Sequence, residues 1–249
     1  ISIVVSALAL CQTGAMSAAG ARARVRAELT REITEVARAH LASDGAAALS
    51  LRAVARELGM ASSAIYRYFP SRDDLLTALI VDAYDTLGAA AEDADAAAGP
   101  GLRARWRAVC GAAREWALTH PHEYALVYGS PVPGYAAPES TIGPAGRVGA
   151  VLCRILVDGI AGGAVDVSSD GTGSDGTLTP GVAEGLGLPG DPTGSVAARA
   201  VFAWTSLFGL INFELFGHTH NVVDDHTTYF DGATARLATL GGLPEQPAG

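Results

Sequence analysis

Side chains that can contact nucleic acid are concentrated between Arg52 and Arg72 of this 249-residue sequence. Arginines bind phosphates, whereas short hydroxyl and aromatic side chains reach base edges in a major groove. Ile65 and Phe69 lie four residues apart and share the opposite, inward side of a short helix. We expect the following residues to contact DNA: Arg52, Ser62, Ser63, Ala64, Tyr66, Arg67, Tyr68 and Arg72.

Two short helices joined by a glycine turn, within residues 50–69, must position these side chains. Ser50 is a suitable N-cap for the first helix, and Ser62 or Ser63 can cap the second. Gly59 supplies the left-handed conformation that ends the first helix without steric cost. The first helix carries one apolar stripe, formed by Leu51, Val54, Ala55 and Leu58. This layout predicts a helix-turn-helix DNA-binding motif, and the alternative is a helical hairpin that makes no DNA contact.

A longer helix is predicted directly after the motif. Pro70 ends the recognition helix, and the spacing of Ser71 and Asp74 is that of a capping box. The predicted helix has one apolar side, formed by Leu75, Leu76, Leu79, Ile80, Tyr84 and Leu87. Arg72 lies at its N-terminus, where a helix favours a phosphate.

Residues 24–87 resemble the N-terminal domain of the tetracycline-repressor (TetR) family of bacterial regulators. The resemblance rests on LRAVARELGM at 51–60 and IYRYFPSRDDLL at 65–76. The chain departs from the family at Tyr68, where a His is common, and at Met60-Ala61, where Val-Ser is common. These departures leave the operator sequence open.

The family resemblance also implies that the N-terminal end of the first long helix lies near the DNA backbone. Arg22, Arg24 and Arg26 would then contact phosphates, with an ordinary solvated helix start as the alternative. The helix itself is expected from an apolar series, Val25, Leu29, Ile33, Val36 and Leu41.

The charge distribution is compatible with a DNA partner despite a net charge of −9. Residues 17–80 contain nine arginines and seven acidic residues, whereas residues 81–249 contain eight arginines and nineteen acidic residues. The acidic part must therefore face away from DNA.

Helical spacing continues through the rest of the chain, and no stretch alternates with a period of two for long enough to predict a strand. Further helices are predicted at 102–119, 120–128, 142–162, 196–216 and 225–240. The predicted fold is all-α, with an N-terminal three-helix helix-turn-helix domain and a larger helical domain for ligand binding and dimerisation.

The family resemblance implies the two expected domains, and composition indicates the loop and the chain ends. Residues 22–87 form the DNA-binding domain, residues 88–241 form the regulatory domain with a flexible loop at 168–190, and residues 242–249 form a tail. Residues 1–21 are expected to be a disordered or non-native leader, with the true start of the protein at Met16. A genuine N-terminal extension is the alternative. The apolar start lacks the basic region of a secretory signal.

The apolar run at 196–216 approaches the length of a membrane span. Arg199, Asn212 and Glu214 interrupt it, so we expect it to pack in a core and against a partner subunit. The family resemblance implies a homodimer through helices 192–217 and 225–241. Two copies related by a two-fold axis would read a palindromic operator.

The C-terminal region resembles a WHG-like type of TetR companion domain, through Trp116-Ala117-Leu118, residues 120–135 and residues 213–218. Such domains hold a small-molecule effector, whose identity the resemblance does not supply. Candidate pocket residues are Trp106, Trp116, His120, Tyr124, Tyr128, Trp204 and Phe208. Aromatic residues at helical spacing also occur as plain core, which is the alternative.

The remaining chemical groups do not predict an enzyme, a cofactor or a metal site. His218, His220 and His226 supply metal-ligand types, and a helical metal-binding protein or enzyme that uses them is the alternative function. Cys110 and Cys153 fall on apolar helix faces, as expected for inert thiols in a reducing cytoplasm. We therefore predict a cytoplasmic dimeric repressor that releases its operator when a small ligand binds.

Overall fold

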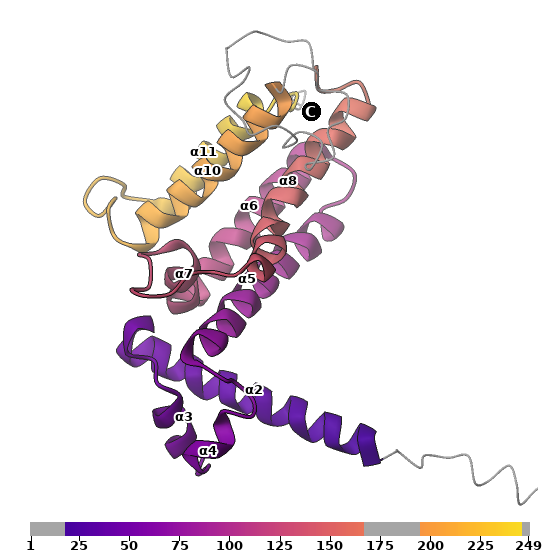
Figure 1. Cartoon of the computed structure of the whole chain (residues 1–249). Coiled ribbons are helices and arrows are strands. Elements are labelled where there is room, and N and C mark those ends of the chain that lie inside the picture. The colour runs from indigo at the N-terminus through magenta and orange to yellow at the C-terminus, as the bar shows by residue number, and fades with distance from the viewer. Residues whose placement is uncertain (1–17, 167–194, 246–249) are drawn as a thin grey trace, which may run out of the picture. The chain divides into compact units, whose positions relative to one another are not determined.

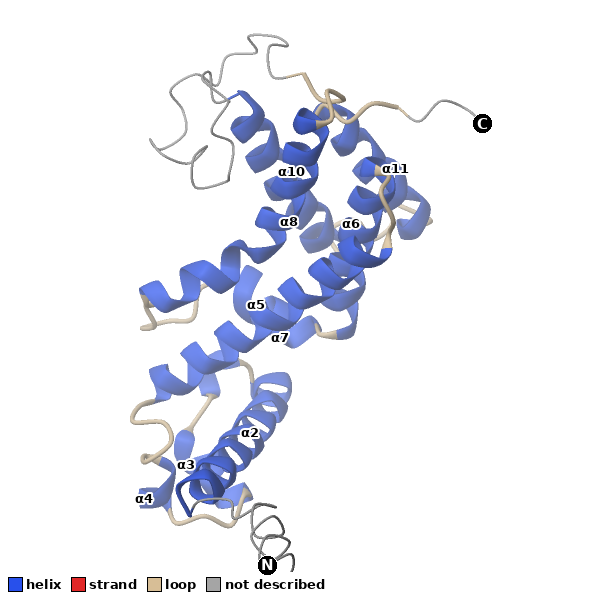
Figure 2. Cartoon of the chain, turned by 90° about the vertical axis from the view of Figure 1, so that its right-hand side faces the viewer, coloured by secondary structure: helices blue, strands red, loops and turns tan. Residues whose placement is uncertain are grey.

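The computed structural model describes residues 18–166 and 195–245, and every regular element in these ranges is a helix (Figures 1 and 2). The helices are α2 (Ala18–Asp44), α3 (Leu51–Glu57), α4 (Ser62–Ile65), α5 (Arg72–Ala97), α6 (Leu102–Thr119), α7 (Pro121–Tyr128), α8 (Ile142–Ala161), α10 (Ser195–Leu215) and α11 (His226–Leu240). Two short 3-10 turns are η1 (Ala46–Ala48) and η2 (Glu139–Thr141). The predicted all-α fold is confirmed.

Two expected segments lie wholly or largely outside the described residues. The expected loop at 168–190 falls entirely outside them, as do residues 1–17 of the expected leader. The remainder of that leader differs from expectation, because helix α2 already begins at Ala18.

The chain forms two compact units, one ending at Leu75 and the other beginning at Leu76. Our sequence interpretation placed this boundary at Leu87 instead. Helix α5 spans the division, and its Leu87 and Ala91 belong to the hydrophobic core of the second unit. The periodicity of a continuous helix cannot reveal where its residues change from one core to another.

In the first unit, α3 packs against both α2 and α4. The core of this unit includes the following fully buried residues: Ile33, Ala37, Val54, Ala55, Ile65 and Leu75. Val25, which we expected in the apolar stripe of the first helix, is instead 60% exposed. The buried residues of α2 begin only at Ile33, so the first turns of this helix extend beyond the core.

In the second unit, α6 packs against α8 and α11, and α10 packs against the same two helices (Figure 1). All four contribute to one hydrophobic core, which also receives Tyr124 from α7. The observed helix α6 has the predicted bounds. Helices α8 and α11 differ from prediction by one residue at one end, and α10 begins and ends one residue earlier than predicted. Trp106 links α6 to α11, because its Nε1 donates to the Thr234 carbonyl oxygen at 3.1 Å.

Helices α8 and α10 are long and apolar enough to cross a membrane by length and composition alone. Both supply buried residues to the shared core, which accounts for their apolar character. Helix α8 also carries Arg147, Arg154 and Asp158, and all three are in ion pairs with other helices. These contacts are typical of a core helix in a globular unit.

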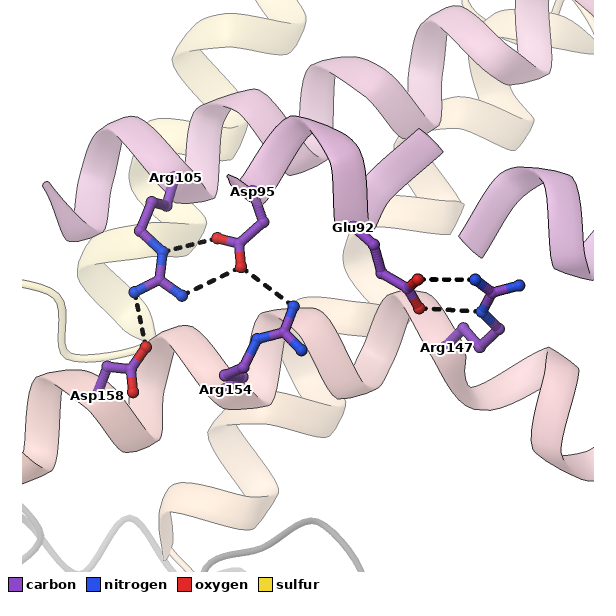
Figure 3. A network of polar contacts seen from close by, with 6 residues as sticks. All are labelled: Glu92, Asp95, Arg105, Arg147, Arg154 and Asp158. Atoms are coloured by element: carbon purple, nitrogen blue, oxygen red, sulfur yellow. Dashed lines mark hydrogen bonds and ion pairs between the residues drawn. The ribbon is translucent and has the colours of Figure 1, made fainter. Parts of the chain in front are cut away.

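Asp95 joins α5 to α6 and α8 through a network of charged hydrogen bonds (Figure 3). Its side chain is 8% exposed and accepts from Arg105 Nε at 2.7 Å and from Arg105 Nη2 at 3.1 Å. Arg154 Nη2 donates to the same carboxylate at 3.1 Å, and Arg105 Nη1 donates to Asp158 at 2.7 Å. Bidentate pairing of this kind fixes both the distance and the orientation of the helices.

Arg147 makes a second connection between α8 and α5 (Figure 3). Its Nε and Nη2 donate to the two oxygens of Glu92 at 3.0 and 2.7 Å. Its Nη1 donates to the carbonyl and carboxylate oxygens of Asp85, at 2.8 and 2.9 Å. The stem of Arg147 lies directly on Gly88, where an added Cβ would approach it to 2.7 Å. Glycine is therefore required at this helix crossing.

We expect Asp95→Asn to lower the free energy of unfolding by about 3 kcal/mol, because it leaves two arginines without their shared buried charge. Hydrogen bonds from Arg105 hold the pKa of Asp95 below its ordinary value of 3.8. The charged group therefore stabilises the fold above that value, and the benefit is lost as pH falls through the lowered pKa. Urea unfolding should show a constant difference near neutral pH that shrinks below about pH 4.

Asp93→Asn is the matched control, because Asp93 lies on the same helix and is exposed. Equal destabilisation by the two substitutions would contradict the role assigned to the Asp95 network.

Candidate DNA-binding site

The turn between α3 and α4 is closed by backbone hydrogen bonds around Gly59. This residue has φ of 65°, the left-handed conformation predicted for it. Met60 N donates to the Ala55 carbonyl at 2.8 Å, and Gly59 N donates to the Arg56 carbonyl at 3.2 Å. This pair of bonds is a Schellman motif, which satisfies the last carbonyls of α3. Ser50 occupies the N-cap position of α3, but its side chain makes no capping bond.

Helix α4 is a single α-helical turn that its buried side chains hold in place. Ile65 is fully buried and Phe69 is 6% exposed, as predicted for the inward pair. Phe69 N donates to the Ile65 carbonyl at 3.0 Å, so helical bonding continues beyond the last residue of α4. The expected serine cap is wrong, because Ala61 is the N-cap and both Ser62 and Ser63 lie at exposed positions.

The outward side of α4 presents the side-chain types that read DNA. Ser62, Ser63, Tyr66 and Arg67 are exposed, and Arg52 is exposed on α3. Ala64 and Tyr68 are half-buried. The structure therefore brings five of the candidate residues to the surface of one helix pair. Their contacts with DNA stay a prediction.

Polar contacts that the sequence did not indicate attach α2 to this helix pair. Arg26 Nη2 donates to the Arg67 carbonyl at 2.9 Å, and its guanidinium carbon lies 5.2 Å from the centre of the Tyr68 ring. His40 Nε2 lies 2.6 Å from Glu57 Oε2 on α3. Arg26 thus positions the end of the recognition helix in addition to any phosphate contact.

The other arginines near the start of α2 remain candidates for the DNA backbone. Arg24 is exposed. Arg22, Arg26 and Tyr68 line a hollow of about 420 Å³. A hollow with two arginines at its wall suits a phosphate group, and the contact of Arg24 with phosphate stays a prediction.

Ser71 and Asp74 pair at the start of α5 as predicted, but the second bond of the pair comes from the Ser71 hydroxyl and not from its backbone N–H. Asp74 N donates to Ser71 Oγ at 3.1 Å, and Ser71 Oγ donates to Asp74 Oδ2 at 2.6 Å. Acidic Asp73 and Asp74 in the first turn also match the positive end of the helix dipole.

Arg72 has an intramolecular role that the sequence did not reveal. Its Nε donates to the Leu49 carbonyl at 3.2 Å, and its Nη2 donates to the carbonyls of Ala46 and Ala47 at 2.8 and 3.3 Å. It therefore fastens the segment before α3 to the start of α5. Its contact with a phosphate stays a prediction. Replacing Arg72 would also remove these carbonyl contacts, so a loss of DNA binding would reflect both effects.

In the second unit, four of the candidate pocket residues form one aromatic cluster. The rings of Tyr128 and Phe208 stack at 4.1 Å between centres, and Tyr124 lies 5.1 Å from Tyr128. Trp204 meets Phe208 edge-on at 6.3 Å. Tyr84 of α5 joins the cluster at 5.9 Å from Tyr128, a neighbour that sequence analysis missed because it lies on a distant helix.

The remaining pocket candidates lie differently. His120 is exposed and follows the end of α6, where its ring stacks on Trp116 at 4.9 Å. This pocket candidate therefore lies at the surface, and its contact with a ligand stays a prediction. Trp106 is a buried core residue bonded to α11. The exposure of a residue at a helix end depends on how that end packs in the tertiary structure, which helical spacing alone does not specify.

The histidine-rich segment near residue 220 has capping and packing contacts. Asp225 caps α11 by accepting from Thr228 N at 3.0 Å, and His226 Nε2 lies 2.9 Å from Thr219 Oγ1. His218 packs on the ring of Phe213. Across residues 18–166 and 195–245, no group of three His, Cys, Asp or Glu side chains can hold a metal ion. The metal-binding alternative is not favoured.

Cys110 and Cys153 are free and buried, as expected. Burial raises the pKa of Cys110 to about 12 and that of Cys153 to about 11. Both remain neutral thiols near pH 7, so they are poor nucleophiles and pack as small apolar side chains.

Two family models match the chain. The model described as "Bacterial regulatory proteins, tetR family" matches residues 33–79, and the model described as "Tetracyclin repressor-like, C-terminal domain" matches residues 106–237. The first contains the helix pair described above, and the second contains the four candidate pocket residues of the aromatic cluster.

Curated proteins and solved structures show the same similarity. The chain is 39% identical over 241 residues to the HTH-type transcriptional regulator Rv1816 of Mycobacterium tuberculosis, covering 93% of this chain and 98% of that protein. It is similar to the crystal structure of the regulatory protein SCO4313, with a TM-score of 0.68, 32% identity, and coverage of 87% and 98%. A protein of unknown function from Rhodococcus sp. RHA1 gives a TM-score of 0.65 at 26% identity, with coverage of 87% and 96%.

We expect Gly59→Ala to lower the free energy of unfolding by about 1–2 kcal/mol, because alanine is strained in the left-handed conformation. Space is not limiting, since an added Cβ has nothing within 4 Å. Gly111→Ala is the control: this residue lies inside α6 with equally open space and an ordinary helical φ, so the substitution should stabilise by about 0.5–1 kcal/mol. Urea unfolding that shifts both variants in the same direction would contradict this account of the turn.

Proposed function

Because the chain belongs to the tetracycline-repressor family of bacterial transcription regulators, which bind DNA through a helix-turn-helix, we propose that it is a cytoplasmic homodimeric repressor released by a small ligand. The observation that carries the proposal is the exposed face of α4 beside Arg52. Ser63, Tyr66 and Arg67 are presented there by buried Ile65 and Phe69. Hydroxyl, phenol and guanidinium groups on one rigid surface suit both phosphates and base edges.

The surface of α10 and α11 supports dimerisation. These helices pack against each other, and their outer sides expose Phe202, Phe213 and Tyr229, by 53%, 56% and 48%. A groove of about 470 Å³ between them is lined by Phe213, Tyr229 and Leu237. Exposed aromatic side chains on two adjoining helices, with a groove between them, are typical of a subunit interface. We propose a second copy of this chain as the partner.

Helix α5 supports a mechanism for ligand control. It runs without a break from Arg72 to Ala97 and contributes residues to both compact units. Its later turns are held by Arg105, Arg147 and Arg154. A ligand that binds one arrangement of the second unit more tightly would shift the population of α5 positions, and operator affinity would change by the same differential free energy.

Selection of bound sites from random duplex DNA tests the proposed function directly. We expect two inverted half-sites with their centres about one helical turn apart, because a two-fold dimer presents two recognition helices. A single half-site, or no enrichment of any sequence, would contradict sequence-specific binding by a dimer.

We expect Arg52→Ala to relax base preference at one position of each half-site, at a cost of about 1–3 kcal/mol for the preferred base. Arg107→Ala is the control, because Arg107 is exposed on α6 and its loss changes net charge equally. Competition binding with duplexes that differ at single positions distinguishes the two. Uniform weakening by both variants would indicate a general charge effect and would argue against base contact by Arg52.

We expect Phe213→Asp to convert the dimer to a monomer and to weaken operator binding about a hundredfold, because the two half-sites would no longer be bound together. Light scattering and gel shift measure the two effects. Leu118→Asp places the same charge on an exposed apolar residue of α6 and should leave both unchanged. A Phe213→Asp protein that stays dimeric would disprove this choice of interface.

A further inference from the structure

Several buried polar atoms of the second unit have no hydrogen-bond partner. Within the described ranges these are Trp116 Nε1, Tyr128 Oη, Trp204 Nε1 and Asn212 Oδ1. Leaving a buried polar group unpaired is energetically costly, and native proteins pair nearly all such groups. Unpaired groups that gather in one place therefore indicate a site for a missing partner.

Three of the four atoms belong to one region. Trp204, Phe208 and Asn212 follow one another at intervals of four residues, so they share a side of α10. The Phe208 ring stacks on Tyr128 at 4.1 Å and meets Trp204 at 6.3 Å. Tyr128, Trp204 and Asn212 are only half-buried as whole residues, although Tyr128 Oη, Trp204 Nε1 and Asn212 Oδ1 are inaccessible. Their apolar parts thus border solvent while their polar atoms face inward.

The surroundings of this region are apolar and aromatic. Helix α8 passes beside the indole of Trp204, and an added Cβ at Gly149 would lie 3.9 Å from its Nε1. Tyr124 is fully buried and donates from its hydroxyl to the Phe208 carbonyl at 3.4 Å. Burial raises the pKa of both Tyr124 and Tyr128, so Tyr128 keeps its proton and can donate it near neutral pH.

The charged groups closest in sequence to Asn212 and Gly149 on these helices are paired with other charged groups. Glu214, two residues after Asn212, accepts from Arg114 Nε and Nη2 at 2.7 and 2.6 Å. Arg147, two residues before Gly149, is bound to Glu92 and Asp85. An anionic or cationic ligand would have to break one of these pairs to gain a counter-ion, which is costly in a buried setting. The region therefore favours a ligand without net charge.

We propose that Tyr128, Trp204 and Asn212 bind a neutral aromatic effector that carries an amide, carbonyl or hydroxyl group. Trp204 Nε1 donates to the ligand's acceptor, and Tyr128 Oη and the Asn212 amide supply a donor and an acceptor. The rings of Tyr124 and Phe208 provide apolar surface for the aromatic part. This inference rests on the proposed ligand response and specifies the class of ligand.

Three naphthalene probes of nearly equal size test the class of ligand. They are 2-naphthamide, which is neutral and polar, 2-naphthoate, which is anionic, and 2-methylnaphthalene, which has no polar group. Isothermal titration calorimetry on the full chain should show 2-naphthamide binding about tenfold or more tightly than either of the others. Equal affinity for all three, or no binding of 2-naphthamide, would overturn the proposal.

A pair of Tyr→Phe substitutions tests the residues. Tyr128→Phe removes an unpaired hydroxyl, so it should preserve or raise the unfolding temperature of the ligand-free protein. It should also lower the affinity for 2-naphthamide about tenfold. Tyr84→Phe removes a hydroxyl that donates to the Val127 carbonyl at 3.2 Å in the same cluster. It should lower the unfolding temperature and leave probe affinity unchanged. The opposite pattern would assign Tyr128 a purely structural role and overturn the proposal.

Operator binding separates this inference from the proposed function. Sequence-specific DNA binding without any probe binding would support the regulator function and contradict the proposed effector site. Probe binding that leaves operator affinity unchanged would support the binding site and contradict the proposed ligand response. Tenfold weaker operator binding in saturating 2-naphthamide, reached in Tyr128→Phe only at about tenfold higher probe concentration, would support both.

Discussion

A helix as short as α4 has no stability of its own, and the DNA-binding surface depends on what holds that helix in place. Forming a first helical turn is unfavourable in isolation because several backbone angles are fixed for one hydrogen bond. Here Ile65 and Phe69 anchor the turn in the core, and Gly59 fixes the direction in which the chain leaves α3. The outward side chains are therefore rigid because the inward ones are buried.

Long-range arginine contacts extend this anchoring to the neighbouring segments. Arg72 binds carbonyl groups just before α3, and Arg26 binds the carbonyl of Arg67 just after α4. Arginines perform a similar task in the second unit, where Arg105, Arg147 and Arg154 bind the carboxylates of α5. Several arginines of this lysine-free chain thus serve structure, so an arginine near the motif is not by itself a DNA contact.

Much of the architecture could be predicted from local sequence. Helix α6 was predicted with its observed bounds, because a glycine-rich break and a proline flank a regular apolar series. The pairing of Ser71 and Asp74 was also predicted, since the partners lie three residues apart. Local patterns failed where partners are distant: the Arg72 contacts span more than twenty residues, and the Arg105 to Asp158 pair spans 53. The exposed position of His120 could not be predicted for the same reason, because exposure at a helix end depends on tertiary packing.

The central claim is that the exposed face of α3 and α4 binds duplex DNA through a limited number of phosphate contacts and base contacts. Fluorescence anisotropy of a selected duplex, titrated at several salt concentrations, measures this most directly. The logarithm of the association constant should fall linearly with the logarithm of salt concentration. Arg67→Ala should reduce the magnitude of that slope by about 1, as expected for the loss of one phosphate contact. Binding that is independent of salt, or no binding to duplex DNA at low salt, would contradict the account.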